Sequence, residues 1–385
     1  MLGAQRIAPY NLQPEALLGA SSKGRAGVPL ACKAGTCAMW GLNNETPFAA
    51  ERTWVRDHRG AEIWIVAVKG SFIIGPDGSL RLDREQSEVS RVPQFVGEPL
   101  ASSLLRESDL VHTKSRTDVL VEGHAYSPPG VLSPEVDARL KLASIDKTVR
   151  VIGDRMIERA ALGMGIRLSD PQPFARMPIT YERSFGGTDQ QSADNKEHGW
   201  EPRNPVGVGF AMNKEHIIGK PAPNIEQPRA PYSDWRRGEP TGFGPIARHW
   251  SPRVKLAGTY DEVWEKKRSP LLPSDFNERF YQCAPMDQQV DGFLKGGEHV
   301  ELHNLTPEGL LSFDLPRITL GMTTWFYDAT EVTHRAALHT VVIQPDKRKF
   351  QLVWHSQLPC HSKVNKLRET EVIVKTRLGS ADDIA

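Results

Sequence analysis

Six carboxylates lie among glycine, proline and aromatic residues, the surroundings in which glycosidases often hold their acid and base. Such a hydrolase needs two carboxyl groups beside the scissile bond. The alternative is that these residues form ion pairs or caps that hold irregular loops, because perturbed carboxylates are also common in structural networks. We favour this structural role and keep Glu182 and Asp287 as the acid/base candidates of a hydrolase hypothesis. The six are Glu182, Asp189, Asp261, Asp275, Asp287 and Glu298.

A second group that could do chemistry is the segment His299-Val300-Glu301-Leu302-His303. Its apolar residues alternate with polar ones, which predicts a strand on which the polar side chains share one face. Side chains two residues apart can ligate one metal ion. The alternative is a solvated face opposite a core face, which most alternating strands show. We predict no metal or other cofactor, and His299 and Glu301 are the candidates if one binds.

Motifs for nucleotide binding or a serine nucleophile are missing from the sequence. Residues 19–24 have the outer glycines of a P-loop, but Arg25-Ala26 stands where Lys-Ser/Thr is required. The Gly207-Val208-Gly209 segment lacks the third glycine of a dinucleotide fingerprint, and no G-x-S-x-G sequence occurs. We therefore predict a protein that is not an enzyme, with the loop-carboxylate hydrolase as the alternative.

The elements that would position these residues are mainly strands. Residues 64–68 form a continuous apolar run that residues 71–74 extend, which is typical of a strand buried on both faces. Hairpins are predicted for 140–142 with 149–151, turning at 146–147, and for 338–343 with 350–354. Helical evidence is limited to one or two turns at 275–280, capped by Ser274. The predicted fold is mainly β, with antiparallel, sandwich-like sheets, long Gly/Pro-rich loops and few short helices.

One region departs from regular sheet. Residues 181–250 hold nine Gly and eight Pro, 24% against 16% for the whole chain. Proline removes ladder donors and glycine packs poorly in strands, so we expect an ordered meander lying over a sheet. Its aromatic residues argue against disorder and are candidate anchors for a partner, with internal packing as the alternative. The anchor candidates are Phe185, Trp200, Trp235, Phe243 and Trp250.

Composition excludes several classes of protein. The 48 Lys+Arg against 47 Asp+Glu give a net charge of +1, so no broad basic surface favours nucleic acid. No run of 18 apolar residues spans a membrane, and the N-terminus lacks the apolar core of a secretory signal. The four cysteines, at 32, 37, 283 and 360, are too sparse for a disulfide framework or a zinc site. We predict a cytoplasmic protein.

The chain divides by composition into four segments. Residues 1–40 are predicted to be an N-terminal extension, and residues 41–170 a β-rich portion. Residues 171–255 form the long Gly/Pro/aromatic loop region, and residues 256–385 a second β-rich portion. We expect 41–385 to form one unit.

Many short segments in order resemble a bacterial family. They lie between about residues 43 and 360, and this chain adds the first 40 residues. The segments include 64–72 (WIVAVKGSF), 108–110 (SDL) with Lys114, 117–121 (TDVLV), 151–155 (VIGDR), 181–187 (YERSFGG), 204–207 (NPVG), 242–245 (GFGP) and 284–288 (APMDQ). Together they resemble the family known as domain of unknown function 2169.

This resemblance implies a role in bacterial type VI secretion. Members are encoded beside PAAR-type spike-tip proteins, VgrG-type spike proteins and toxic effectors, and are thought to be adaptors or chaperones that load an effector onto the spike. The resemblance implies no catalytic residues. The hypothesis that follows is an adaptor that binds a PAAR-type tip protein or its effector, through contacts in the 181–250 meander.

Overall fold

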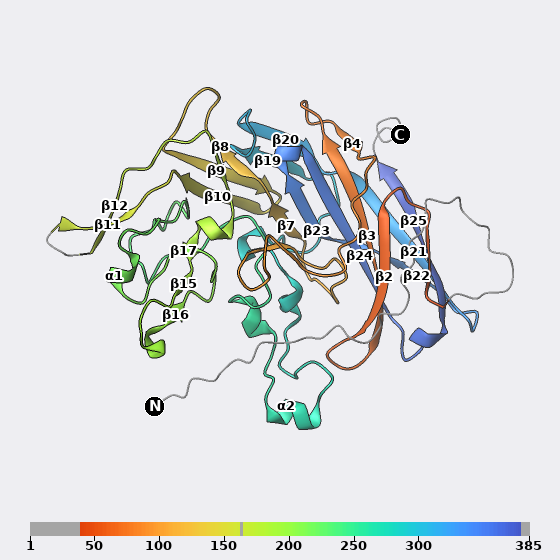
Figure 1. Ribbon diagram of the computed structural model, residues 1–385. Helices are drawn as coiled ribbons and strands as arrows, with labels where there is room; N and C mark the ends of the chain where they lie inside the picture. The colour runs from red at the N-terminus through yellow and green to blue at the C-terminus, as the bar shows by residue number, and fades with distance from the viewer. Residues whose placement is uncertain (1–38, 162–164, 379–385) are drawn as a thin grey trace. The chain divides into compact units, whose positions relative to one another are not determined.

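The longest apolar run of the sequence forms the centre of a six-stranded sheet in the computed structural model, which describes residues 39–161 and 165–378. This strand, β3 (Glu62–Ile74), is buried at every position from 63 to 72, because sheet neighbours and packed layers cover both of its faces. It pairs antiparallel with β24 from Ile63 opposite Pro359 to Ile73 opposite Lys349 (Figure 1). The other strands are β2 (Ala49–Arg56), β4 (Leu80–Leu82), β7 (Asp118–Val121), β23 (Ala337–Gln344) and β24 (Lys349–Pro359).

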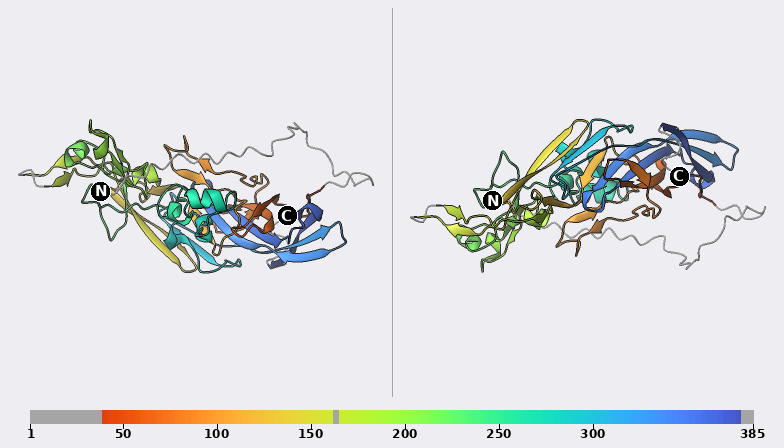
Figure 2. Two further views of the ribbon diagram at one scale, coloured as in Figure 1. Left: turned by 90° about the horizontal axis from the view of Figure 1, so that it is seen from below. Right: turned by 90° about the horizontal axis from the view of Figure 1, so that it is seen from above.

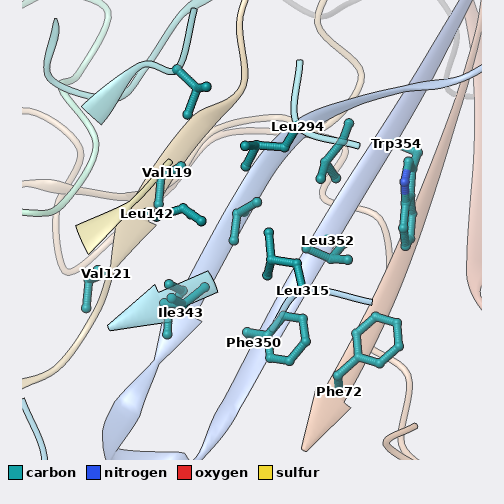
Figure 3. Packing of buried hydrophobic residues seen from close by; sticks show 14 of the residues in the cluster. Phe72, Val119, Val121, Leu142, Leu294, Leu315, Ile343, Phe350, Leu352 and Trp354 are labelled. Carbon is teal, nitrogen blue, oxygen red and sulfur yellow. The ribbon is translucent and has the colours of Figure 1, made fainter. Parts of the chain in front are cut away.

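A five-stranded sheet packs on this one. Inward-facing residues of both sheets belong to the same apolar cluster, and the Phe313 and Phe350 rings stack with centroids 5.1 Å apart. Phe350 also stacks on Phe72, and Figure 3 shows these two rings side by side. With Phe313, three rings connect the two sheets. The strands, in spatial order, are β18 (Ile225–Glu226), β10 (Ile145–Ile152), β9 (Glu135–Leu142), β19 (His299–His303) and β20 (Leu310–Asp314).

A four-stranded sheet contributes to the same apolar cluster through buried residues such as Leu320, Met322 and Val372. The Trp64 Nε1 donates a 3.0 Å hydrogen bond to the Thr370 hydroxyl, which satisfies a buried indole where the layers meet. Its strands, in order, are β1 (Gly41–Asn44), β25 (Leu367–Leu378), β21 (Arg317–Phe326) and β22 (Glu331–Arg335).

The remaining elements are short, and nine of those given below begin in the loop region, which both views of Figure 2 show largely as coil. Strands hold 41% of the described residues, and the same ranges contain two short α-helices. The short strands are β5 (Gln94–Phe95), β6 (Leu104–Arg106), β8 (His124–Tyr126), β11 (Ile157–Arg159), β12 (Ile166–Leu168), β13 (Arg176–Pro178), β14 (Phe185–Gly186), β15 (Thr188–Asp189), β16 (Gly199–Trp200) and β17 (Val208–Gly209). The helices are α1 (Lys214–Ile217) and α2 (Glu262–Lys267), with 3-10 turns η2 (Tyr181–Arg183), η3 (Asn195–Glu197), η4 (Arg253–Leu256), η5 (Glu278–Tyr281), η6 (Met286–Gln288), η7 (Pro345–Lys347) and η8 (Val364–Lys366).

The predicted fold class, mainly β with sandwich-like sheets, is confirmed, with one refinement. The pairs β1–β25, β7–β23 and β14–β17 are parallel, so two of the three large sheets are mixed. From Ala38 onward the chain forms one compact unit in which β3 and β24 share a sheet although almost three hundred residues separate them. The predicted extension, residues 1–40, falls almost entirely outside the described residues, as do Cys32 and Cys37.

The two hairpins form, but one turn lies elsewhere than predicted. Strands β23 and β24 face each other across η7, with Ile343 opposite Phe350. Strands β9 and β10 pair with Ile145 opposite Leu142, so the turn is at 143–144, where Ala143 has a positive φ of 51°. Asp146 and Lys147 are therefore strand residues, which places Lys147 on the buried face.

The helical turn expected at 275–280 is also displaced. A 3-10 turn occupies Glu278–Tyr281, and its cap is Asn277 rather than Ser274. The Asn277 side chain accepts a 3.0 Å hydrogen bond from the Arg279 amide, which fixes where the turn begins.

In the ranges that the structure describes, no helix has the length and apolar character needed to cross a membrane.

Candidate functional site

A cleft of about 590 Å³ opens where β10 meets the loops at 227–256 and 279–289. It contains residues of two segments singled out by the sequence analysis, 242–245 and 284–288, together with the candidate Asp287. Exposed side chains at its rim, among them Glu239 and Met286, show that it opens to solvent. Its apolar walls are formed by Pro240, Ile246, Pro252, Leu256, Pro285 and Met286.

Lys147 lies at the base of this cleft, with its side chain only 6% exposed. Alternation along β10 buries it in phase with Ile145 and Val149. Its Nζ donates to Asp287 Oδ1 at 2.9 Å and to Gln288 Oε1 at 2.8 Å. Burial lowers the pKa of the Lys147 ammonium, and the Asp287 charge opposes that shift. In the sequence, Lys147 alternates with the apolar residues Ile145 and Val149, which would have indicated a buried lysine. The prediction of a turn at 146–147 excluded Lys147 from the strand, so this pattern was not recognised.

Buried ion pairs hold one wall of the cleft in place. Arg253, itself 4% exposed, donates to Glu107 Oε2 at 2.8 Å and to the carbonyl oxygens of Ile246 and Phe280. Arg248 donates to the other Glu107 oxygen at 2.8 Å. Burial raises the pKa of Glu107, but the two arginines outweigh it and lower that pKa to about 2. Glu107 is therefore ionised at neutral pH and ties the 246–253 loop to the sheet region.

A second buried network lies behind this wall. The Lys114 Nζ donates to Asp118 Oδ2 at 2.6 Å and to the Thr340 hydroxyl at 2.9 Å. Asp118 also accepts hydrogen bonds from Gln282 Nε2 at 2.7 Å and from the Cys283 amide at 2.8 Å. Burial raises the pKa of the Cys283 thiol to about 12, so this cysteine is not a nucleophile at neutral pH.

A second hollow of about 750 Å³ adjoins the cleft. The two share four lining residues, which makes them one continuous groove. We call this the joined groove; its shared residues are Lys147, Gln227, Thr241 and Asp287.

Comparison with known proteins places the chain in a family. The family described as "Uncharacterized protein conserved in bacteria (DUF2169)" matches residues 59–355. The chain belongs to the DUF2169 family. The match runs from the loop before β3 into β24 and includes every residue that lines the joined groove. No curated protein and no solved structure matches the chain.

The carboxylates that could serve a hydrolase all have structural contacts in this DUF2169 protein. Glu182 Oε1 accepts a 2.8 Å hydrogen bond from the Ser103 amide, and Asp287 pairs with Lys147. Asp287 lines the joined groove and Glu182 does not. The others hold turns and loops: Asp189 pairs with His216, Asp261 caps α2, Asp275 binds Thr259, and Glu298 accepts from the amides at 295 and 296.

Three of the five proposed aromatic anchors are core residues. Phe185, Phe243 and Trp250 are each 2% exposed or less, so none presents a surface to a partner. Their assignment as contact residues is therefore wrong. Each ring packs in the interior, where burial of its large apolar surface stabilises loops that have few backbone hydrogen bonds to neighbouring strands. Trp235 is half-buried against the cluster around Ile157 and Phe185, whereas Trp200 is 60% exposed.

Replacing Trp200 with alanine should change the free energy of unfolding by less than about 0.5 kcal/mol, since the ring is exposed. Chemical denaturation measures this, with Trp250→Ala as the buried control, which should lose several times more stability. A large stability loss for Trp200→Ala would contradict its placement at the surface.

The strand predicted for the metal candidates forms as β19. Its polar residues share a face, but they form hydrogen bonds and ion pairs with other charged side chains. His299 Nδ1 lies 2.6 Å from Asp314 Oδ1, and Lys141 donates to Glu301 Oε1 at 3.3 Å. His303 Nε2 lies 3.4 Å from Glu301 Oε2. Across the described ranges, no three His, Cys, Asp or Glu side chains are placed to hold a metal ion.

Proposed function

We propose that this DUF2169 protein is a cytoplasmic, non-enzymatic adaptor of bacterial type VI secretion. It binds a PAAR-type spike-tip protein or the toxic effector attached to it, and assists loading onto a VgrG-type spike. The chain belongs to the DUF2169 family, and it is the resemblance to this family that implies a role in type VI secretion.

The observation that carries the proposal is an open groove on a preorganised body. The groove has apolar walls and exposed rim side chains, and buried ion pairs at Glu107 and Asp118 fix the loops around it. A rigid binding surface loses little conformational entropy on association, which favours stable protein–protein contact. A hydrolase receives less support, because Glu182 and Asp287 are engaged in structural contacts and do not line one groove.

Co-expression with the effector and spike-tip proteins encoded beside it tests the adaptor function. We expect a complex that co-elutes in size-exclusion chromatography and has the mass of a stoichiometric assembly. The control is an unrelated effector with its own tip protein, which should elute separately. Elution of the folded protein alone with every neighbour would overturn the proposal. Turnover of a glycoside that Asp287→Asn abolishes would instead establish the hydrolase.

A further inference from the structure

The joined groove contains two cationic side chains whose charges nothing in the described structure balances. In the first hollow, Lys147 pairs with Asp287, and Arg203 pairs with Glu201 and Glu239 at 2.7 and 2.8 Å. Arg253 is neutralised by Glu107. Arg279 lines the same hollow, and no described residue forms an ion pair or hydrogen bond with its guanidinium.

The second hollow repeats this arrangement. Arg139 pairs with Asp146 at 2.6 Å, and Asp137 pairs with Arg150 at 2.8 Å. Arg229 lines this hollow, and within the described ranges its guanidinium has no partner. Each hollow therefore offers one free guanidinium, a planar fork of donors that matches a carboxylate in a bidentate fashion.

The groove also presents polar side chains that can hydrogen-bond a ligand, together with apolar surface. Thr241 is only 4% exposed and lines both hollows, yet its hydroxyl has no hydrogen-bond partner among the described residues. The side-chain amide of Gln227 is equally without a partner in those ranges and also lines both hollows. Met286 is 67% exposed at the rim, far more than an apolar side chain of a packed loop needs to be.

We propose that the joined groove binds an extended acidic segment of a partner protein. Arg229 and Arg279 bind carboxylates of that segment, one in each hollow. Thr241 and Gln227 hydrogen-bond its backbone, and an apolar side chain packs on Met286, Ile246 and Leu256. The identity of the partner as a secretion component rests on the proposed function, whereas the chemistry of the groove does not.

The same charges argue against other occupants. Only two guanidinium groups of the groove lack a charged partner among the described residues, which is too few to bind the continuous phosphates of a nucleic acid, and the net charge of +1 supplies no broad attractive field. A small anion would occupy one hollow and leave the other guanidinium unpaired. A chain with separated carboxylates satisfies both arginines.

Display of random twelve-residue peptides on phage tests the groove without knowledge of the natural partner. We expect wild-type protein to enrich peptides in which Asp or Glu residues flank an apolar residue. Dissociation constants for the enriched peptides, measured by fluorescence anisotropy, should rise at least tenfold in Arg229→Glu/Arg279→Glu. They should change less than twofold in Arg84→Glu, since Arg84 is an exposed arginine that lines neither hollow. Both groove arginines are exposed, so the melting temperature should not change.

Enrichment without acidic residues, no enrichment, or equal affinity for the folded double variant would overturn the proposal. The outcomes for the adaptor function can be distinguished from those for the groove. If the co-eluting complex persists in the double variant, the function stands and the groove is not its docking site. If no neighbour co-elutes but acidic peptides bind and lose affinity as expected, the groove stands and the adaptor function does not.

Discussion

Replacing Asp118 with alanine should destabilise the protein by about 3–5 kcal/mol, the range typical of breaking a buried ion pair. Asp118 is 0% exposed and accepts hydrogen bonds from Lys114, Gln282 and the Cys283 amide. The substitution leaves the Lys114 ammonium buried without its counter-charge and two neutral donors unsatisfied. Urea unfolding at neutral pH measures the loss.

Matched variants distinguish charge from shape. Asp118→Asn keeps the size and some hydrogen bonds but not the charge, so it should fall between wild type and Asp118→Ala. Asp328→Ala removes an exposed partner of Lys363 and should change stability far less than Asp118→Ala does. If Asp118→Ala lost no more stability than Asp328→Ala, the buried network would not stabilise the fold.

Stability should fall between pH 7 and pH 5, and two buried histidines that resist protonation should contribute about 3–4 kcal/mol of that loss. The His339 and His355 rings stack with centroids 4.4 Å apart, 3% and 2% exposed. Burial lowers the pKa of His355 to about 3 and that of His339 well below its usual value near 6.5. The unfolded chain therefore binds more protons below pH 6.5. The contribution of the two neutral histidines to the free energy of unfolding is complete above that pH, and it declines as the pH falls toward their folded pKa values.

Unfolding free energies measured at pH 7, 6 and 5 test this slope. Glu107, with a folded pKa of about 2, contributes little in this window. A His339→Phe/His355→Phe variant should show a much flatter profile, whereas His361→Gln, at an exposed position, should keep the wild-type slope. Equal stability at pH 5 and pH 7 in the wild type would contradict the burial of these two rings.

Local pattern was sufficient to predict the strands with the strongest apolar runs and the fold class. The apolar run of β3 requires burial on both faces, and the alternation at 299–303 requires a strand with one polar face, because side-chain period follows from backbone geometry. The hairpin of β23 and β24 followed from two apolar runs separated by turn residues. The segments that resemble DUF2169 were also sufficient to predict the family.

Turn position and burial were not determined by local pattern. Asp146-Lys147 has the composition of a turn, yet the pairing of β9 with β10 places the turn at 143–144. The Lys147 side chain therefore points inward, where its ammonium donates a hydrogen bond to the Asp287 carboxylate. The rings of Phe243 and Trp250 occur in a Gly/Pro-rich segment that suggests exposure, yet the core encloses them. Sequence composition describes a residue's neighbours along the chain, whereas burial depends on what packs against it.

The sequence by itself determined the strands with strong apolar patterns, the mainly β class and the family, since these depend on short-range periodicity and on ordered segments. Only the tertiary structure decided the site. Arg253 meets Glu107 across 146 residues and Lys147 meets Asp287 across 140, so no local spacing signals either contact. The joined groove, with its free Arg229 and Arg279, exists because folding pairs every other charge that lines it and leaves these two without partners in the described structure.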